Sequence, residues 1–77
     1  MRARHPSIRD AFGTRLRVLR NRAGLTQEKL AFRADLDRSY VGQVERGEVN
    51  VSIDNIAKLA AGLRVPPRDL FDSSDAK

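Results

Sequence analysis

The sequence contains no cysteine and no tryptophan, one histidine and one tyrosine, and aromatic residues make up only 5% of its 77 residues. Without cysteine, neither a disulfide nor a thiolate metal site is available, and the lone His5 stands in an arginine-rich stretch. The longest uncharged apolar run, residues 59–63, is far shorter than the ~20 residues that span a bilayer. Arginines interrupt every apolar run near the N-terminus, unlike in a signal peptide. We expect a soluble, cytoplasmic protein without metal or cofactor.

The chain also lacks a pattern of residues that catalysis requires. Its carboxylates are scattered over predicted helix caps and exposed faces rather than paired. A chain of this length forms one small domain, which has little depth for a desolvated pocket. We therefore predict that the protein is not an enzyme.

Basic residues are in excess and unevenly distributed. Fifteen Lys and Arg against ten Asp and Glu give a net charge of +5. Residues 1–22 hold seven arginines and one acid, a net of +6, whereas residues 23–77 hold eight bases and nine acids, a net of −1. A charge of +5 is ordinary for a small domain, but arginine in this excess favours a polyanionic partner such as nucleic acid.

Apolar residues recur at helical spacing along most of the chain, which predicts an all-α fold. Ser7 with Asp10 three positions later forms a capping-box pattern, and Gly24 suits a helix end, so we predict a helix over residues 8–23. Its apolar stripe is Ile8, Phe12, Leu16, Leu19 and Ala23. The arginines expected off this stripe, in solvent, are Arg9, Arg15, Arg17 and Arg22.

Three further helix starts share one device. Thr26, Asp37 and Ser52 are suitable N-caps, and each has one apolar residue just before it and another four residues after it. Such a hydrophobic staple sets the angle at which the chain enters a helix. The pairs are Leu25 with Leu30, Leu36 with Val41, and Val51 with Ile56. They predict helices over residues 27–34, 38–46 and 53–63.

Turn residues complete the pattern. Asp35 suits a left-handed turn position, and Gly47 ends the third helix. Pro66 and Pro67 break the chain before a short fifth helix that ends near Phe71. We thus predict a compact five-helix domain over residues 8–71, a flexible basic leader over residues 1–7 and a frayed tail over residues 72–77.

The second and third helices have the geometry of a helix-turn-helix, because a three-residue link with the apolar Leu36 at its centre joins them. Leu36, Val41 and Val44 account for the buried side of the third helix. The residues expected outside are Arg38, Ser39, Tyr40, Gln43 and Arg46. A solvated helix face would explain polar residues there, but an outward tyrosine and base-reading types favour contact with the DNA major groove.

Residues 12–71 resemble the Cro/repressor-type helix-turn-helix family, also called the xenobiotic-response-element family, which has the lambda-repressor-like fold. The matching segments are FGTRLR at 12–17, GLTQEKLA at 24–31 and SYVGQVERG at 39–47. Within this family, the segments at 36–40, 45–47 and 50–52 are most similar to the controller proteins of restriction–modification systems. Those are small homodimers that regulate their own operon and the endonuclease gene.

The resemblance implies a role for each matching position. Arg38, Ser39 and Gln43 match the positions that read base edges, for which Arg has a two-bond contact with guanine. The positions that hold the DNA backbone are matched by Gln27, Tyr40, Arg46 and Asn50. Arg20 and Glu45 match a partly buried structural ion pair between the first and third helices. As alternatives, Gln27 is a good first-turn residue, and Arg46 favours the C-terminal end of its helix.

Dimerisation is expected because one recognition helix covers only half a site. Leu63, Val65, Leu70 and Phe71 form an apolar cluster for a two-fold interface, with Phe71 as a plug of the monomer core as the alternative. Paired in this way, two third helices would lie about 34 Å apart, one turn of DNA. The basic leader is expected to be disordered, with a minor-groove contact through Arg2 and Arg4 as the alternative.

These observations predict a sequence-specific transcriptional regulator that binds a pseudo-palindromic operator as a homodimer, of the controller type. RNA polymerase is a further candidate partner, since an activator has to contact it. A generic repressor or an antitoxin of the same family is the nearest alternative. A protein-interaction module on the same fold, without base reading, is the alternative from another functional class.

Overall fold

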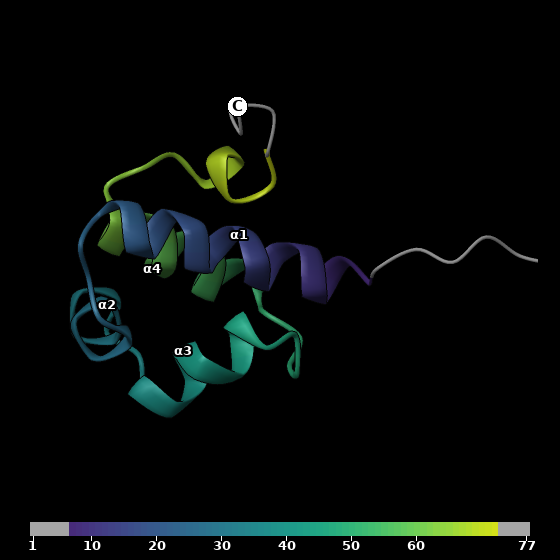
Figure 1. Cartoon of the computed structure of the whole chain (residues 1–77), viewed down its shortest axis with the longest axis horizontal. Helices are drawn as coiled ribbons and strands as arrows, with labels where there is room; N and C mark the ends of the chain where they lie inside the picture. The colour runs from purple at the N-terminus through teal and green to yellow at the C-terminus, as the bar shows by residue number, and fades with distance from the viewer. Residues whose placement is uncertain (1–6, 73–77) are drawn as a thin grey trace, which may run out of the picture.

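The computed structural model describes residues 7–72, so the predicted leader (apart from Ser7) and residues 73–77 of the tail lie outside the described residues. Within that range the chain forms α1 (Ile8–Arg22), α2 (Gln27–Ala34), α3 (Arg38–Glu45), α4 (Ile53–Leu63) and the 3-10 turn η1 (Pro67–Leu70) (Figure 1). Residues 7–72 contain no strand, which confirms the all-α prediction. Every predicted α-helix boundary lies within one residue of the observed one.

The predicted N-caps form at three of four helices. The hydroxyl groups of Ser7, Thr26 and Ser52 each accept a hydrogen bond from the backbone N–H three residues later. Asp37 occupies the N-cap position of α3, but its side chain makes no capping hydrogen bond. The first turn of α3 therefore lacks the side-chain cap that the sequence predicted. Ser7, the last residue of the predicted leader, caps α1 as its pattern with Asp10 predicts.

Left-handed residues end the helices, mostly where the turn chemistry predicts them. Gly24 and Gly47 have φ angles of 72° and 73°, and Asp35 has a φ of 59° between α2 and α3. Arg64, with a φ of 62°, was not predicted. It ends α4 with its backbone N–H bonded to the carbonyls of that helix, although a left-handed arginine is uncommon.

The fifth helix is a single 3-10 turn, so the five-helix prediction is wrong in that detail. Pro67 supplies no backbone N–H, and Pro66, which precedes it, makes no side-chain cap. Only four residues, Pro67–Leu70, then adopt helical geometry before Phe71. A segment this short closes i→i+3 hydrogen bonds in preference to α-helical ones.

The core lies where the four helices meet. Its fully buried side chains are Leu16, Leu30, Val41, Val44, Leu59 and Leu70. The apolar stripe of α1 is buried only along its middle: Phe12 and Leu16 are inside, whereas Ile8 is 73% exposed and Ala23 is exposed. No helix within residues 7–72 combines the length and the apolar character needed to cross a bilayer.

Arg15 is buried, contrary to the prediction that it meets solvent. Its residue is 8% exposed, and its Nε–H donates to the carbonyl oxygen of Asp69 at 2.8 Å. This bond joins α1 to η1, which Figure 1 shows on the side of α1 away from α3. The hydrogen-bond partner is 54 residues away in the sequence, so helical periodicity could not reveal it.

Candidate nucleic-acid interface

The helix α3 presents a polar outer face and is fixed by its inner one. Val41 and Val44 are 0% and 1% exposed, in contact with the core. Arg38 and Ser39 are exposed in the first turn, and Gln43 is half-buried one turn later. Within residues 7–72 the side chains of these three residues have no hydrogen-bond or ion-pair partner. Strong donor groups on a rigid helix are thus left available to a ligand.

Tyr40 lies at the edge of the core, which corrects the expectation that it stands fully outside. Its ring is half-buried against the core cluster, and its hydroxyl oxygen accepts a hydrogen bond from Nδ2 of Asn55 at 3.0 Å. Because the oxygen accepts that bond, the hydroxyl hydrogen is left for another acceptor. Core packing therefore explains the position of the tyrosine ring, and the hydroxyl group can still donate to the DNA backbone.

The carboxylate of Glu45 is the centre of a hydrogen-bond network between three helices. Arg20 on α1 donates to it through Nε at 2.6 Å and Nη2 at 3.1 Å, and Gln27 on α2 donates through Nε2 at 3.1 Å. Arg17 approaches to 3.8 Å. The Glu45 side chain is 1% exposed and that of Arg20 is 13% exposed, so the expected partners lie together, out of water.

The third guanidinium nitrogen of Arg20 ties this network to the turn after α1. Its Nη1 donates to the carbonyl oxygen of Leu25 at 2.8 Å. The hydrogen bond to Glu45 is the main cause that raises the pKa of the Arg20 guanidinium above its usual value, opposed by desolvation. The pair therefore sets the position of α3 relative to the start of α2.

Gln27 occupies the first turn of α2, beside Gly42 of α3. A Cβ added at Gly42 would lie 3.6 Å from Oε1 of Gln27, so the glycine leaves room for that side chain. One amide hydrogen of Gln27 is directed to Glu45. The other amide hydrogen and the unpaired backbone N–H groups of the first helical turn can still meet an anion.

The loop after α3 carries the other two predicted backbone contacts. Arg46 is paired with Glu48, with Nε and Nη2 donating at 2.9 and 3.3 Å. These hydrogen bonds raise the pKa of Arg46 and lower the pKa of the Glu48 carboxyl. Asn50 is exposed, and its Oδ1 accepts from Nε of Arg9 at 3.0 Å. Arg46 is thus not free in this structure, and Glu48 competes for it.

The four residues predicted for a dimer interface separate into two groups. Leu63 and Leu70 are 6% and 0% exposed and belong to the core of this chain, so their side chains are not available to a partner. Val65 is half-buried, and Phe71 is 56% exposed with its ring 5.2 Å from that of Phe12. Phe71 is therefore not a buried plug, and of the four residues only Val65 and Phe71 are accessible to a partner.

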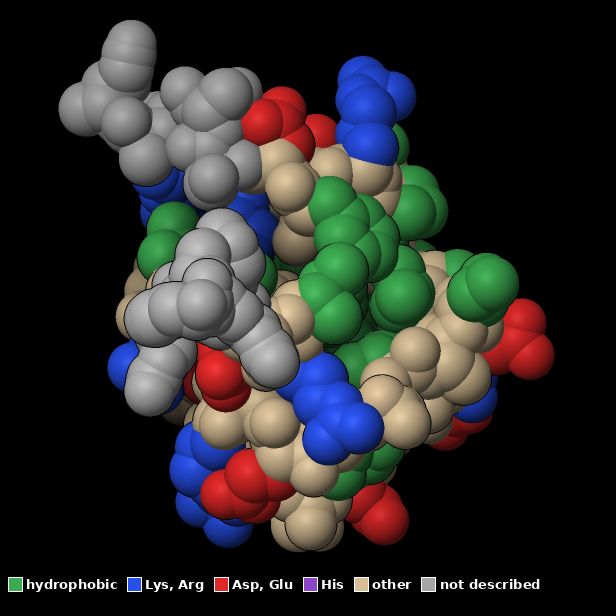
Figure 2. All heavy atoms as spheres, turned by 90° about the vertical axis from the view of Figure 1, so that its right-hand side faces the viewer, with side chains coloured by type: hydrophobic (Ala, Val, Ile, Leu, Met, Phe, Trp, Pro, Cys, Tyr) green, Lys and Arg blue, Asp and Glu red, His purple; other side chains and the backbone are tan. Residues whose placement is uncertain are grey.

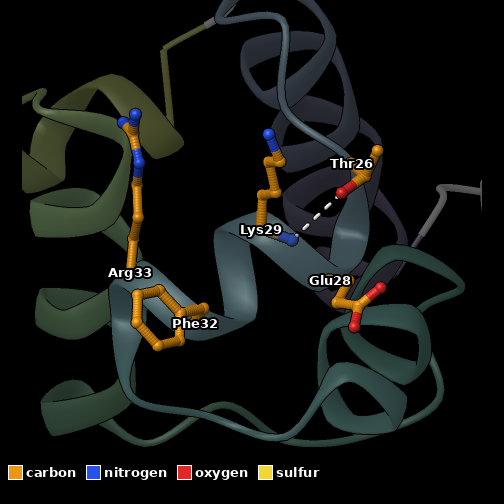
Figure 3. A pocket seen from close by; sticks show the side chains of 5 residues that line it. All are labelled: Thr26, Glu28, Lys29, Phe32 and Arg33. Carbon is orange, nitrogen blue, oxygen red and sulfur yellow. Dashed lines mark hydrogen bonds between the residues drawn. The ribbon is translucent and has the colours of Figure 1, made fainter.

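One exposed aromatic residue was not identified from the sequence. Phe32 on α2 is 87% exposed and borders a shallow hollow together with Thr26, Glu28, Lys29 and Arg33 (Figure 3). Thr26 makes the capping bond with the backbone of Lys29, and Nη1 of Arg33 donates to the carbonyl oxygen of Gly62 on α4 at 3.4 Å. The high exposure follows from the position of Phe32 on the outer side of α2, opposite the buried Leu30 and Ala34.

A family described as a helix-turn-helix domain matches residues 11–73 of this chain. The chain belongs to this family. It is 48% identical over 67 residues to the control protein C.BamHI of Bacillus amyloliquefaciens, covering 86% of this chain and 83% of that protein. It is 42% identical over 65 residues to the control protein C.MunI of Mycoplasma sp., covering 83% and 88%.

Solved structures agree with this assignment. The restriction-modification controller protein C.AhdI from Aeromonas hydrophila is 59% identical and superposes with a TM-score of 0.82, over 83% of this chain and 97% of that one. The hypothetical transcription factor NHTF from Neisseria is 34% identical with a TM-score of 0.83, over 99% of this chain and 91% of that one. The resemblance to controller proteins seen in the sequence is confirmed. In this helix-turn-helix domain α2 and α3 are the two helices of the motif.

Proposed function

We propose that this protein is a sequence-specific, cytoplasmic DNA-binding transcription regulator of the controller type, which binds a pseudo-palindromic operator as a homodimer. It needs no cofactor and is not an enzyme in this proposal. Arg38, Ser39 and Gln43 read base edges in the major groove. Gln27, Tyr40, Arg46 and Asn50 hold the phosphate backbone and set the register of α3.

One observation carries this proposal: the three base-reading side chains of α3 lack partners within residues 7–72, while the same helix is fixed through Glu45 and the core. A surface helix kept only for solubility would not need an anchor to two other helices. Similarity to controller proteins over more than four-fifths of the chain supports the same function.

Another apolar face supports a dimer interface better than the predicted cluster does. Hydrophobic side chains gather on the face toward which the N-terminal end of α1 points (Figure 2). They border a groove whose apolar lining is Ile8, Phe12, Val49, Val51, Ile56 and Phe71 and whose polar lining is Arg9 and Asn50. Ile8 and Phe71 are 73% and 56% exposed. We infer that the apolar part of this face pairs two copies, with Phe71 as its member from the predicted cluster and with Arg9 and Asn50 outside the contact.

Selection of bound duplexes from a random DNA pool tests the proposal as a whole. We expect recovery of a motif with dyad symmetry whose half-sites lie about one helical turn, roughly 34 Å, apart. Equal retention of all duplexes, with binding that is lost as salt rises, would mean that only electrostatic contacts exist. That outcome would favour the protein-interaction alternative over base reading.

Arg38→Ala is expected to remove discrimination at one base-pair position of each half-site. The loss of a two-bond contact to guanine corresponds to about 1–3 kcal/mol between the right and the wrong base. Binding of the selected operator and of single-base variants, measured by titration, checks this result. Arg68→Ala is the matched control, because Arg68 is an exposed arginine on η1. Unchanged discrimination in Arg38→Ala would exclude Arg38 as a base reader.

Glu48→Gln is expected to strengthen binding to all duplexes alike. The change releases Arg46 from its carboxylate partner and removes a negative charge beside the predicted phosphate contact. With one more phosphate neutralised, the slope of log affinity against log salt should steepen by about 0.9. Titrations at several salt concentrations check this. An unchanged slope would mean that Arg46 does not reach a phosphate.

RNA polymerase is a further proposed partner, because Phe32 on the outer face of α2 is 87% exposed. A regulator that activates transcription has to contact the polymerase through a surface not occupied by DNA or by its own second copy. Phe32 lies outside both surfaces that are proposed above.

A further inference from the structure

Arg9 joins the first turn of α1 to the loop that follows α3. Its Nε–H donates to Oδ1 of Asn50 at 3.0 Å, across 41 residues of sequence. The same turn of α1 packs on the C-terminal end of α3, since a Cβ added at Gly47 would lie 3.2 Å from the Cα of Asp10. Arg9 therefore lies beside the loop that holds Arg46 and Asn50, outside the helix-turn-helix itself.

The bond to Asn50 leaves the other N–H donors of the two side chains without a partner within residues 7–72, at the polar lining of the groove. A guanidinium has five N–H groups and no acceptor, and here one of the five is used. The amide oxygen of Asn50 accepts that bond, and its two amide hydrogens have no partner within residues 7–72. A planar fork next to an amide NH2 group suits the oxygens of a phosphate.

The acidic groups nearby do not occupy this site. Within residues 7–72 Arg9 has no carboxylate partner. Asp10, its neighbour in the sequence, directs its carboxylate toward Gly47, and a Cβ there would overlap that carboxylate. Glu48 is paired with Arg46. A hydrogen bond that only tethers the loop would need neither a guanidinium group nor surroundings without a carboxylate.

We propose that Arg9 and Asn50 together form a phosphate site that grips the DNA backbone beside the C-terminal end of α3. This inference rests on the proposed function, because the phosphate belongs to the DNA that α3 reads. Arg9 supplies the charge and orients the amide of Asn50, while Asn50 fixes the guanidinium. The site contributes affinity and register and carries no sequence information of its own.

The test is a salt titration of duplex binding with the full chain and the variants Arg9→Ala, Arg9→Lys and Asn50→Ala. We expect Arg9→Ala to weaken binding to the operator and to an unrelated duplex by the same factor, with a slope of log affinity against log salt smaller by about 0.9. A rise in salt from about 50 to about 200 mM should then cost this variant roughly threefold less affinity than the wild type.

Arg9→Lys separates charge from geometry. Lysine keeps the charge, so the salt slope should be kept, but it cannot hold Asn50 and a phosphate at once as a planar fork does. We therefore expect weaker binding at an unchanged slope. The double variant Arg9→Ala with Asn50→Ala shows whether the two residues act together. If they act independently, its loss of affinity equals the product of the two single losses. If Asn50 depends on Arg9 for its orientation, the loss is smaller than that product.

Arg68→Ala is the control, since it removes the same charge from η1, on the other side of α1 from α3 (Figure 1). If Arg9→Ala gives the same affinity and slope as Arg68→Ala, the proposed site does not exist. Thermal unfolding of each variant excludes a folding defect as the cause of weaker binding. If the wild type binds the operator and the unrelated duplex equally, base reading by α3 is overturned. The phosphate site is tested separately, by the salt slope of Arg9→Ala alone.

Discussion

Glu45→Ala is expected to lower the free energy of unfolding by about 3–5 kcal/mol, a large part of the stability of so small a domain. The substitution removes the acceptor for two hydrogen bonds from Arg20 and one from Gln27. The Arg20 side chain, 13% exposed, would then keep its charge without a carboxylate. Urea or thermal unfolding monitored by circular dichroism measures the loss.

Glu48→Ala is the control for this experiment, because it breaks an ion pair whose two side chains are 55% and 51% exposed. Exposed pairs of this kind contribute little to stability, so its unfolding midpoint should match that of the wild type. An unfolding midpoint for Glu45→Ala equal to that of Glu48→Ala would show that the network does not hold α1, α2 and α3 together. DNA binding by Glu45→Ala should fall in step with the folded fraction.

Gly13→Ala is expected to destabilise the protein by about 1–3 kcal/mol or more, through overpacking between two helices. A Cβ at this position would lie 2.6 Å from the carbonyl oxygen of Glu45 and closer still to that of Val44. Both atoms belong to the backbone of α3, so no side chain can rotate away. The helices α1 and α3 would have to separate, which would also stretch the contact between Arg20 and Glu45.

Thr14→Ala is the matched comparison for Gly13, since Thr14 is the next residue of α1 and is exposed. Alanine favours a helix over glycine and over threonine, so on local grounds both substitutions should stabilise α1. Relative to the wild type, Gly13→Ala should therefore lower the free energy of unfolding, whereas Thr14→Ala should raise it. Equal stabilisation of both would mean that α1 and α3 do not approach as closely as described here.

Helix boundaries were predictable because caps and apolar spacing are local. The hydroxyls of Ser7, Thr26 and Ser52 accept the expected backbone N–H groups, and Asp35 takes the left-handed turn. Such features depend on residues within one helical turn of each other. Arg64 is the exception, since an arginine carries no sequence signal for a left-handed helix end.

Predictions that required knowledge of distant neighbours were less reliable. Arg15 was expected in water and instead bonds to the backbone of Asp69. Leu70, expected at a dimer interface, is fully buried in the monomer. Tyr40 was expected outside and packs at the edge of the core with a partner on α4. In each case the outcome depends on which element lies opposite, which local periodicity does not encode.

The sequence by itself determined the four α-helices, the helix-turn-helix and the candidate base-reading residues Arg38, Ser39 and Gln43. These follow from spacing, capping chemistry and motif, all of which are written in neighbouring residues. Only the tertiary structure decided that Gln27 shares Glu45 with Arg20, that Glu48 pairs with Arg46, that Arg9 donates to Asn50, and that Gly13 lets α1 approach α3. The physical reason is that these contacts join residues far apart in the chain, and their geometry exists only once the helices have packed.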